Sequence, residues 1–240
     1  MFESLPLLKQ GVNEQHMNKV YLTGSDSINT ELKKMFGSNI DIIDNINDAE
    51  IIIESTNYPV EKKLDAIKNI DGKTDKSIPI LTSSLCVSVS EQCAVCKYPD
   101  RLVGIGLYDT ISSSKQIEIA PSKITSPEAK EQAEKFLKSS TIKYSVVPDR
   151  VGLVFPRILA MIINEAAQVY DEKIASREDI DTAMKLGTNY PFGPLEWADK
   201  TGIELIYNIL TALQRDFGDD RYRPHPSLKE MMNLNKRFYE

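Results

Sequence analysis

The chain has 240 residues, of which 41% are hydrophobic and 27% charged, a composition typical of a folded protein rather than a disordered one. The formal net charge is −6 and the lysines are spread along the chain, so no basic face for nucleic acid is expected. No run approaches the roughly 20 apolar residues of a membrane span, and the N-terminal MFESLPLLKQG lacks the features of a secretory signal; we therefore expect a cytoplasmic protein that does not bind membranes.

The first part of the chain alternates short apolar, β-branched runs with amphipathic stretches. We expect strands at 19–24, 39–44, 49–54, 78–83, 101–107, 115–120 and 142–147, and helices at 27–36, 61–70, 87–95 and 127–138. This alternation is typical of a doubly wound, mostly parallel sheet covered on both faces. The sequence therefore predicts a Rossmann-like α/β domain over residues 1–148.

From Val151 onward the apolar spacing is helical. We expect a long helix to about Tyr170, followed by helices at 177–186, 195–213 and 226–235. Residues 149–240 are therefore predicted to form a second, all-α domain.

The first strand–turn–helix is where a doubly wound fold offers a dinucleotide a glycine turn and a helix N-terminus. The fingerprint G-x-G-x-x-G would begin at Gly24, but the chain reads Gly24-Ser-Asp-Ser-Ile-Asn29 and keeps only the first glycine. Asp26 stands where a pyrophosphate should approach, and its charge would repel the phosphates. Asp44, 20 residues after Gly24, could bind a ribose hydroxyl. Both Gly24 and Asp44 also fit an α/β sheet that binds no nucleotide.

The three cysteines do not form a disulfide framework, because their number is odd and the chain is long. Cys93 and Cys96 form a C-x-x-C motif, but a zinc site needs four ligands and only Cys86, His16 and His225 could complete it. A redox motif belongs at a helix N-terminus, whereas this one falls at the end of a predicted helix. We interpret the cysteines as free thiols and predict no metal site.

The second part of the chain carries an ordered set of motifs. They are Asn164-Glu-Ala166, 175–181 (ASREDID), 184–187 (MKLG), 190–194 (YPFGP), Ala198-Asp199 and Gly202. Ser176-x-x-Asp179 is a variant of the capping box that begins a helix, and Gly187 is expected to end it. The prolines and glycine of 190–194 then favour a rigid turn into the next helix.

These motifs, in this order, resemble the C-terminal helical domain of the L-3-hydroxyacyl-CoA dehydrogenases. The resemblance extends to 221–228 (RYRPHPSL) and, in the first part, to 82–85 (TSSL), 101–104 (RLVG) and 117–119 (IEI). It implies an NAD-dependent oxidoreductase of fatty acid metabolism that interconverts 3-hydroxyacyl-CoA and 3-ketoacyl-CoA, or acts on a related small 3-hydroxy acid. It also implies a homodimer formed through the helical domain.

The resemblance places catalytic residues at four positions, two of which are chemically empty in this chain. Ser83 matches a substrate-contacting serine and Glu118 the glutamate that orients a catalytic histidine. The histidine itself, the general base, is replaced by Gly106, and an asparagine at the start of the long helix is replaced by Pro156. Glycine cannot exchange a proton and proline has no side-chain donor. The residues themselves also allow plainer roles, with Ser83 closing a strand and Glu118 facing solvent or capping.

Two further features of the resemblance concern the cofactor and the CoA group. Lys63 matches a family lysine near the nicotinamide, and Gly24 and Asp44 occupy the expected cofactor positions. The family's long helical arm after the second strand is reduced to Asn45–Asp48, a four-residue connection. The cofactor site is therefore expected to be a weakened NAD site.

Two hypotheses about function follow. In the first, the chain is an enzyme that still turns over an acyl-CoA or 3-hydroxy acid slowly, with Tyr108, Asp109 or Lys115 replacing the lost base. In the second, it is a pseudoenzyme that persists as a dimeric binding or regulatory protein. The sequence favours weak or absent dehydrogenase activity.

Overall fold

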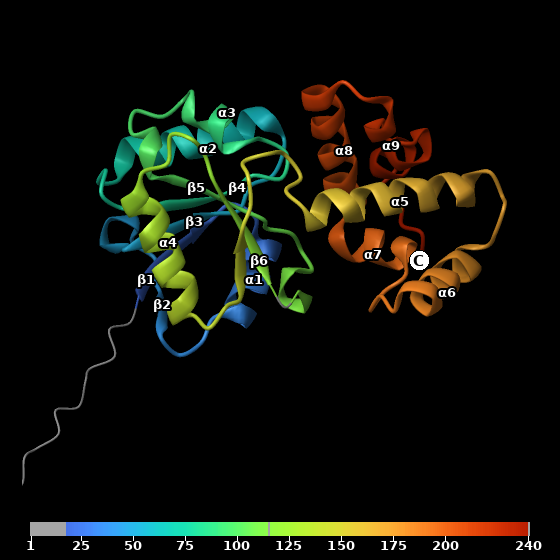
Figure 1. Ribbon diagram of the computed structural model, residues 1–240, viewed down its shortest axis with the longest axis horizontal. Helices are drawn as coiled ribbons and strands as arrows, with labels where there is room; N and C mark the ends of the chain where they lie inside the picture. The colour runs from blue at the N-terminus through green and yellow to red at the C-terminus, as the bar shows by residue number, and fades with distance from the viewer. Residues whose placement is uncertain (1–17, 115, 240) are drawn as a thin grey trace, which may run out of the picture.

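A computed structural model describes residues 18–114 and 116–239. The N-terminal segment, His16 and the candidate base Lys115 lie outside the described residues. Within them the chain forms a sheet flanked by helices, followed by a helical half (Figure 1).

The sheet has seven strands in the order β2-β1-β3-β4-β5-β6-β7. All neighbouring strands are parallel except β5 and β6, which pair antiparallel. The predicted doubly wound, mostly parallel sheet is confirmed. The strands are β1 (Asn18–Thr23), β2 (Ile40–Ile42), β3 (Ile51–Glu54), β4 (Ile80–Ser83), β5 (Leu102–Ile105), β6 (Ile117–Pro121) and β7 (Tyr144–Val146).

Helices cover both faces of the sheet because the central strands are apolar on both sides. Ile51 and Ile53 of β3 face the core cluster under α1 and α4, whereas Ile52 faces the cluster under α2 and α3. The flanking helices are α1 (Asp26–Met35), α2 (Val60–Lys73), α3 (Val89–Cys93) and α4 (Pro127–Ser139), and the short 3-10 turns are η1 (Ile46–Asp48), η2 (Pro99–Arg101) and η3 (Ile111–Ser113).

The helical half packs around the long helix α5. It contains α5 (Phe155–Asp171), α6 (Arg177–Thr188), α7 (Pro194–Thr201), α8 (Ile203–Phe217), η4 (Asp220–Tyr222) and α9 (Pro226–Asn233). Ser176 caps α6 as predicted, its hydroxyl accepting the N–H of Asp179 at 3.1 Å. The predicted end at Gly187 is wrong: α6 runs to Thr188, and Asn189 caps it with a left-handed φ of 57°.

The single helix predicted over 195–213 is also wrong, because two helices meet at Gly202. The φ of Gly202 is +95°, which breaks the helical path while its N–H still bonds to the carbonyl oxygen of Ala198 at 2.9 Å. Apolar residues continue at helical spacing on both sides of this glycine, so periodicity alone does not reveal the break.

The segment joining the two halves is anchored to the sheet. Asp149 accepts the N–H groups of Val89 at 2.8 Å and Ser90 at 2.9 Å, so its carboxylate caps α3. The Gly152 N–H donates to the Leu85 carbonyl oxygen at 2.8 Å. The predicted domain boundary at 148/149 falls in this segment. In the part of the chain that the structure describes, no helix has the length and apolar character needed to cross a membrane.

Candidate functional site

A polar crevice of about 350 Å³ lies at the carboxyl ends of β1 and β3, beside the N-terminus of α1. Here the strand order reverses direction, which is where open α/β sheets bind ligands. Gly24 makes the turn: its φ is +107°, and a Cβ there would lie 2.7 Å from both Ser55 Oγ and Thr56 N. The crevice is lined by Gly24, Ser25, Asp26, Ser27, Ile28, Ser55, Thr56, Asn57, Tyr58, Lys62, Asp109 and Leu205.

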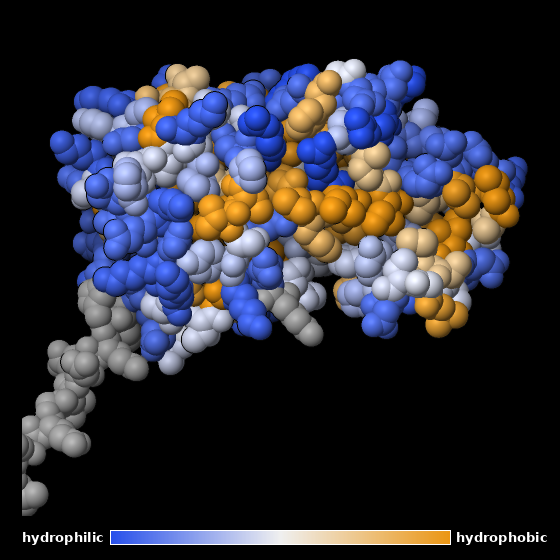
Figure 2. Space-filling model, in the orientation of Figure 1, coloured by the Kyte–Doolittle hydropathy of each residue, from blue (hydrophilic) through white to orange (hydrophobic). Residues whose placement is uncertain are grey.

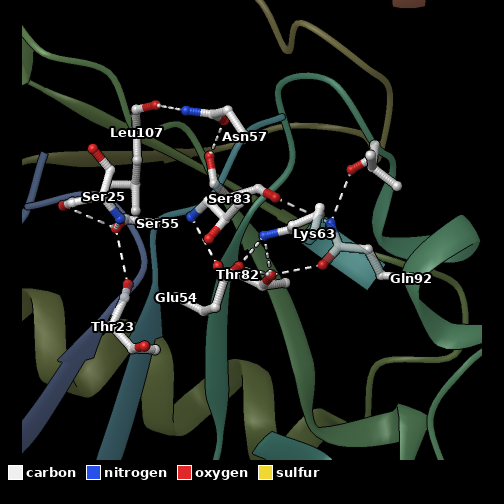
Figure 3. Close-up of polar contacts among 12 residues, drawn as sticks. Thr23, Ser25, Glu54, Ser55, Asn57, Lys63, Thr82, Ser83, Gln92 and Leu107 are labelled. Atoms are coloured by element: carbon white, nitrogen blue, oxygen red, sulfur yellow. Dashed lines mark hydrogen bonds and ion pairs between the residues drawn. The ribbon is translucent and has the colours of Figure 1, made fainter. Parts of the chain in front are cut away.

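The polar groups of this turn already bond to one another. The Ser25 N–H donates to Ser55 Oγ at 2.9 Å (Figure 3). That hydroxyl also lies 2.8 Å from Asn29 Oδ1. Asp26 is the first residue of α1. Asp109 is half-buried, burial raises its pKa, and its Oδ1 has no hydrogen-bond partner among the described residues. The crevice thus carries two carboxyl groups where a phosphate would sit.

A second cavity, of about 440 Å³, lies between the sheet and the helical half. Its lining includes four aromatic residues and comprises Gly106, Tyr108, Ile111, Ser113, Ser114, Gln116, Glu118, Phe155, Pro156, Tyr190, Pro191 and Trp197. Glu118, on β6, uses both carboxylate oxygens as the cap of α5: they accept the N–H groups of Val154 and Phe155, each at 2.9 Å.

Gly106 lies beside Glu118 in the lining of this second cavity. Its N–H donates to the Glu118 carbonyl oxygen at 2.9 Å, so the two residues are neighbours across the antiparallel pair β5–β6. A Cβ at position 106 would meet Leu153 Cδ1 at 3.1 Å. A side chain at position 106 would therefore contact Leu153, which would have to shift by a few tenths of an ångström.

Ser83 belongs to a buried, hydrogen-bonded group next to the crevice. Leu107 is fully buried, and its carbonyl oxygen accepts the Asn57 side-chain N–H at 2.9 Å. Ser83, 1% exposed, donates its hydroxyl to Asn57 Oδ1 at 2.6 Å (Figure 3). Asn57 lines the crevice, whereas Ser83 lines neither cavity.

The remaining predicted site residues lie apart from both cavities. Lys63 is fully buried; its ammonium group forms an ion pair with Glu54 and donates to Thr82 Oγ1 at 2.7 Å (Figure 3). Asp44 is exposed and does not line the crevice. Of the five predicted residues, the structure thus brings Gly24 to the crevice and Glu118 to the second cavity.

Comparison with known proteins decides the family. Residues 9–150 match the NAD-binding domain of 3-hydroxyacyl-CoA dehydrogenase, and residues 152–237 match the C-terminal domain of the same family. The chain is 31% identical to a 3-hydroxybutyryl-CoA dehydrogenase of Clostridioides difficile over 193 residues, which cover 80% of this chain and 69% of the relative. The chain belongs to the 3-hydroxyacyl-CoA dehydrogenase family.

Further relatives agree. A probable 3-hydroxybutyryl-CoA dehydrogenase of Bacillus subtilis is 31% identical over 208 residues, covering 84% of this chain and 71% of the relative. The crystal structure of an (S)-3-hydroxybutyryl-CoA dehydrogenase from Ralstonia eutropha has the same fold, with a TM-score of 0.76, 23% identity, and coverage of 91% of this chain and 94% of the other.

The residues of the crevice fit only in part the pyrophosphate that the NAD-binding domain of this dehydrogenase family implies. The tight turn at Gly24 is kept, and Lys62 in the lining is cationic. However, the Ser25 N–H, a donor that a phosphate would need, is bonded to Ser55, and Asp26 places a carboxylate at the α1 terminus. Helix N-termini bind anions through free N–H groups and a positive dipole end, and Asp26 opposes the second of these.

No substitute base stands beside Glu118 in the described part of this dehydrogenase-family chain. Burial raises the pKa of Tyr108 to about 12, and its hydroxyl pairs with Ser114 Oγ at 2.5 Å. Asp109 lines the crevice and not the cavity that holds Glu118. A general base works best with a pKa near the operating pH, and Tyr108 is far from it.

Sequence reasoning missed Asn57 and Leu153. Asn57 stands three residues after β3, at the carboxyl end of a strand, where a polar residue is a reasonable site candidate. Nothing in the sequence marks Leu153 as the residue that fills the space at position 106, because the contact joins segments 47 positions apart in the chain.

Proposed function

We propose that this member of the 3-hydroxyacyl-CoA dehydrogenase family has weak or no dehydrogenase activity. The glycine at position 106, beside Glu118 in the lining of the second cavity, is the observation that carries the proposal.

A missing base lowers the rate of the reaction. General acid–base catalysis contributes about 10²–10⁴-fold, and position 106 offers no side chain to accept a proton. Glu118, which would orient such a base, instead accepts two N–H groups of the α5 terminus.

The test is oxidation of NADH, followed by its absorbance, with acetoacetyl-CoA as acceptor. We expect no turnover above background, against an active family member assayed in parallel. Turnover near the typical enzyme value of about 10 s⁻¹ would refute the proposal. Gly106→His combined with Leu153→Ala then tests the cause: turnover should appear in this variant if the missing base limits the rate.

We also infer that NAD(H) binds weakly, because Asp26 repels phosphate at the α1 terminus. Asp26→Gly removes this charge and supplies the second glycine of the fingerprint, so it should strengthen NADH binding measured by calorimetry. Asp44→Asn is the matched control, since Asp44 is exposed and outside the crevice. Equal affinities for Asp26→Gly and the unaltered protein would contradict this reasoning.

A second candidate function, a homodimeric binding protein, is favoured by the exposed face of α5. Apolar surface lies over this helix (Figure 2), and Val154 and Ile158, one turn apart, are 47% and 52% exposed. Contiguous apolar patches of this kind often mark protein interfaces. Ile158→Glu should convert a dimer to a monomer in sedimentation analysis. Ile124→Glu, at a residue 50% exposed on the other half, should not; a monomeric unaltered protein would exclude this function.

A further inference from the structure

The second cavity has an aromatic lining that does not depend on the lost hydride chemistry. Phe155 is central: its ring centroid lies 6.0 Å from that of Tyr108 and 5.6 Å from that of Trp197. The Tyr190 ring adds a third side, 6.0 Å from Trp197. A volume of about 440 Å³ is within the range of small-molecule sites, about 300–1,000 Å³.

One charged side chain lines this cavity in the described part of the chain. It is Glu118, which is partly exposed, and no lysine, arginine or histidine stands among the described lining residues to neutralise it. Its two backbone partners fix the carboxylate in place but leave its negative charge. A fixed anion among aromatic rings creates a negative potential, because the faces of the rings are themselves negative.

Trp197 supplies a second, independent indication that a ligand belongs here. Its side chain is only 8% exposed, and its Nε1–H has no acceptor among the described residues. Buried polar groups are normally hydrogen-bonded, and exceptions call for an explanation. An acceptor atom on a bound molecule would satisfy this donor.

We propose that this cavity binds a small organic ammonium ion that carries an apolar group with an acceptor oxygen at its far end. The ammonium would pair with Glu118 and lie against the rings of Tyr108 and Phe155, with the apolar part toward Tyr190 and the oxygen accepting the Trp197 Nε1–H. This inference goes beyond the proposed function and is independent of it, since it concerns equilibrium binding without NADH or turnover.

The charge decides among ligands of similar shape. A carboxylate of the same size would be repelled by Glu118, and a neutral molecule would contact the rings but gain nothing from the charge. Cation–π contacts alone favour a cation by about 0.5–2 kcal/mol, which corresponds to an affinity gain on the order of 2- to 30-fold.

Trp197 is the single tryptophan of the chain and therefore reports binding directly. Its fluorescence would be titrated with three matched probes: 2-(4-hydroxyphenyl)ethylammonium, 2-(4-hydroxyphenyl)ethanol and 3-(4-hydroxyphenyl)propanoate. Each carries a phenolic oxygen that can accept the Trp197 N–H. We expect saturable binding of the ammonium, affinity for the alcohol about tenfold lower, and still weaker binding of the carboxylate. Equal or tighter binding of the alcohol or the carboxylate, or no saturable change with the ammonium, would overturn the proposal.

Two variants locate the site. Glu118→Gln keeps the shape and should abolish the preference for the ammonium over the alcohol; Glu165→Gln, the same charge change at an exposed position of α5, should leave it intact. Because Glu118 also caps α5, Phe155→Leu provides a second test that spares the cap, since it keeps the Phe155 backbone N–H. It should weaken binding of the ammonium more than binding of the alcohol, because the ammonium lies against the Phe155 ring. An unchanged preference in both Glu118→Gln and Phe155→Leu would overturn the assignment.

Discussion

The buried ion pair of Lys63 and Glu54 makes a prediction that distinguishes a structural role from a cofactor role. Both side chains are fully buried beneath the carboxyl ends of β3 and β4, and Glu54 Oε1 also accepts the Thr56 N–H at 2.8 Å. Burial lowers the pKa of Lys63, and Glu54 partly offsets this effect. Lys63→Met would leave Glu54 buried without its cation, a change that typically costs about 3–5 kcal/mol of unfolding free energy.

Replacing both partners should cost much less. In Glu54→Leu/Lys63→Met no charge remains buried at this pair, and such exchanges are often neutral or raise the unfolding free energy by about 1–4 kcal/mol. Urea denaturation followed by far-UV circular dichroism would measure Lys63→Met, Glu54→Leu, the double variant and the original chain. The double variant should be more stable than Lys63→Met alone, and the four unfolding free energies together give the coupling energy between the two positions.

Lys62→Met is the matched control, because Lys62 is exposed and lines the crevice. It should change stability by no more than about 0.5 kcal/mol and should weaken NADH binding. Lys63→Met should lower the unfolding free energy substantially and leave NADH binding unchanged. If Lys63→Met lowered NADH affinity more than Lys62→Met and left stability nearly unchanged, the lysine would be a cofactor residue, as the family resemblance implied.

Three further predictions concern stability and reactivity. Burial raises the pKa of the Cys86 and Cys96 thiols to about 12, so a disulfide reagent at pH 8 should label them slowly in the native protein and quickly in urea. Thiols of the unfolded chain ionise near about 8.5, so stability should fall as the pH rises above that value. Gly202→Ala should lower the free energy of unfolding by on the order of 1–3 kcal/mol, because the φ of Gly202 is +95°. Gly187→Ala should raise it by about 0.5–1 kcal/mol, measured by thermal unfolding, because Gly187 lies inside α6 with open space around it. Asp149→Ala should lower the free energy of unfolding by about 1.5–3 kcal/mol, because the Asp149 carboxylate accepts two N–H groups at the start of α3.

The sheet was predictable because its signal is local. Runs such as Ile51–Ile53 are apolar at every position, which indicates a strand covered on both faces. The break at Gly202 was not predictable from spacing, because the apolar stripe continues through it. A glycine inside a helical pattern is usually tolerated, and only the backbone angle distinguishes this one.

The candidate site was predictable only in part. The register that placed position 106 beside Glu118 agrees with the hydrogen bond between them. The roles of Ser83 and Lys63 depend on partners 26 and 9 positions away, and neither side chain lines a cavity. The plainer interpretation of Glu118 as a capping carboxylate describes its observed contacts, although the cap belongs to a helix more than 30 residues downstream.

The close approach of Leu153 to Gly106 has a consequence for placing a side chain at this position. A Cβ at position 106 would lie 3.1 Å from Leu153 Cδ1, so the leucine would have to shift by a few tenths of an ångström. Gly106→His alone therefore changes the packing and adds an imidazole at the same time. In a Leu153→Ala background the contact is removed, and the effect of the imidazole can be measured by itself.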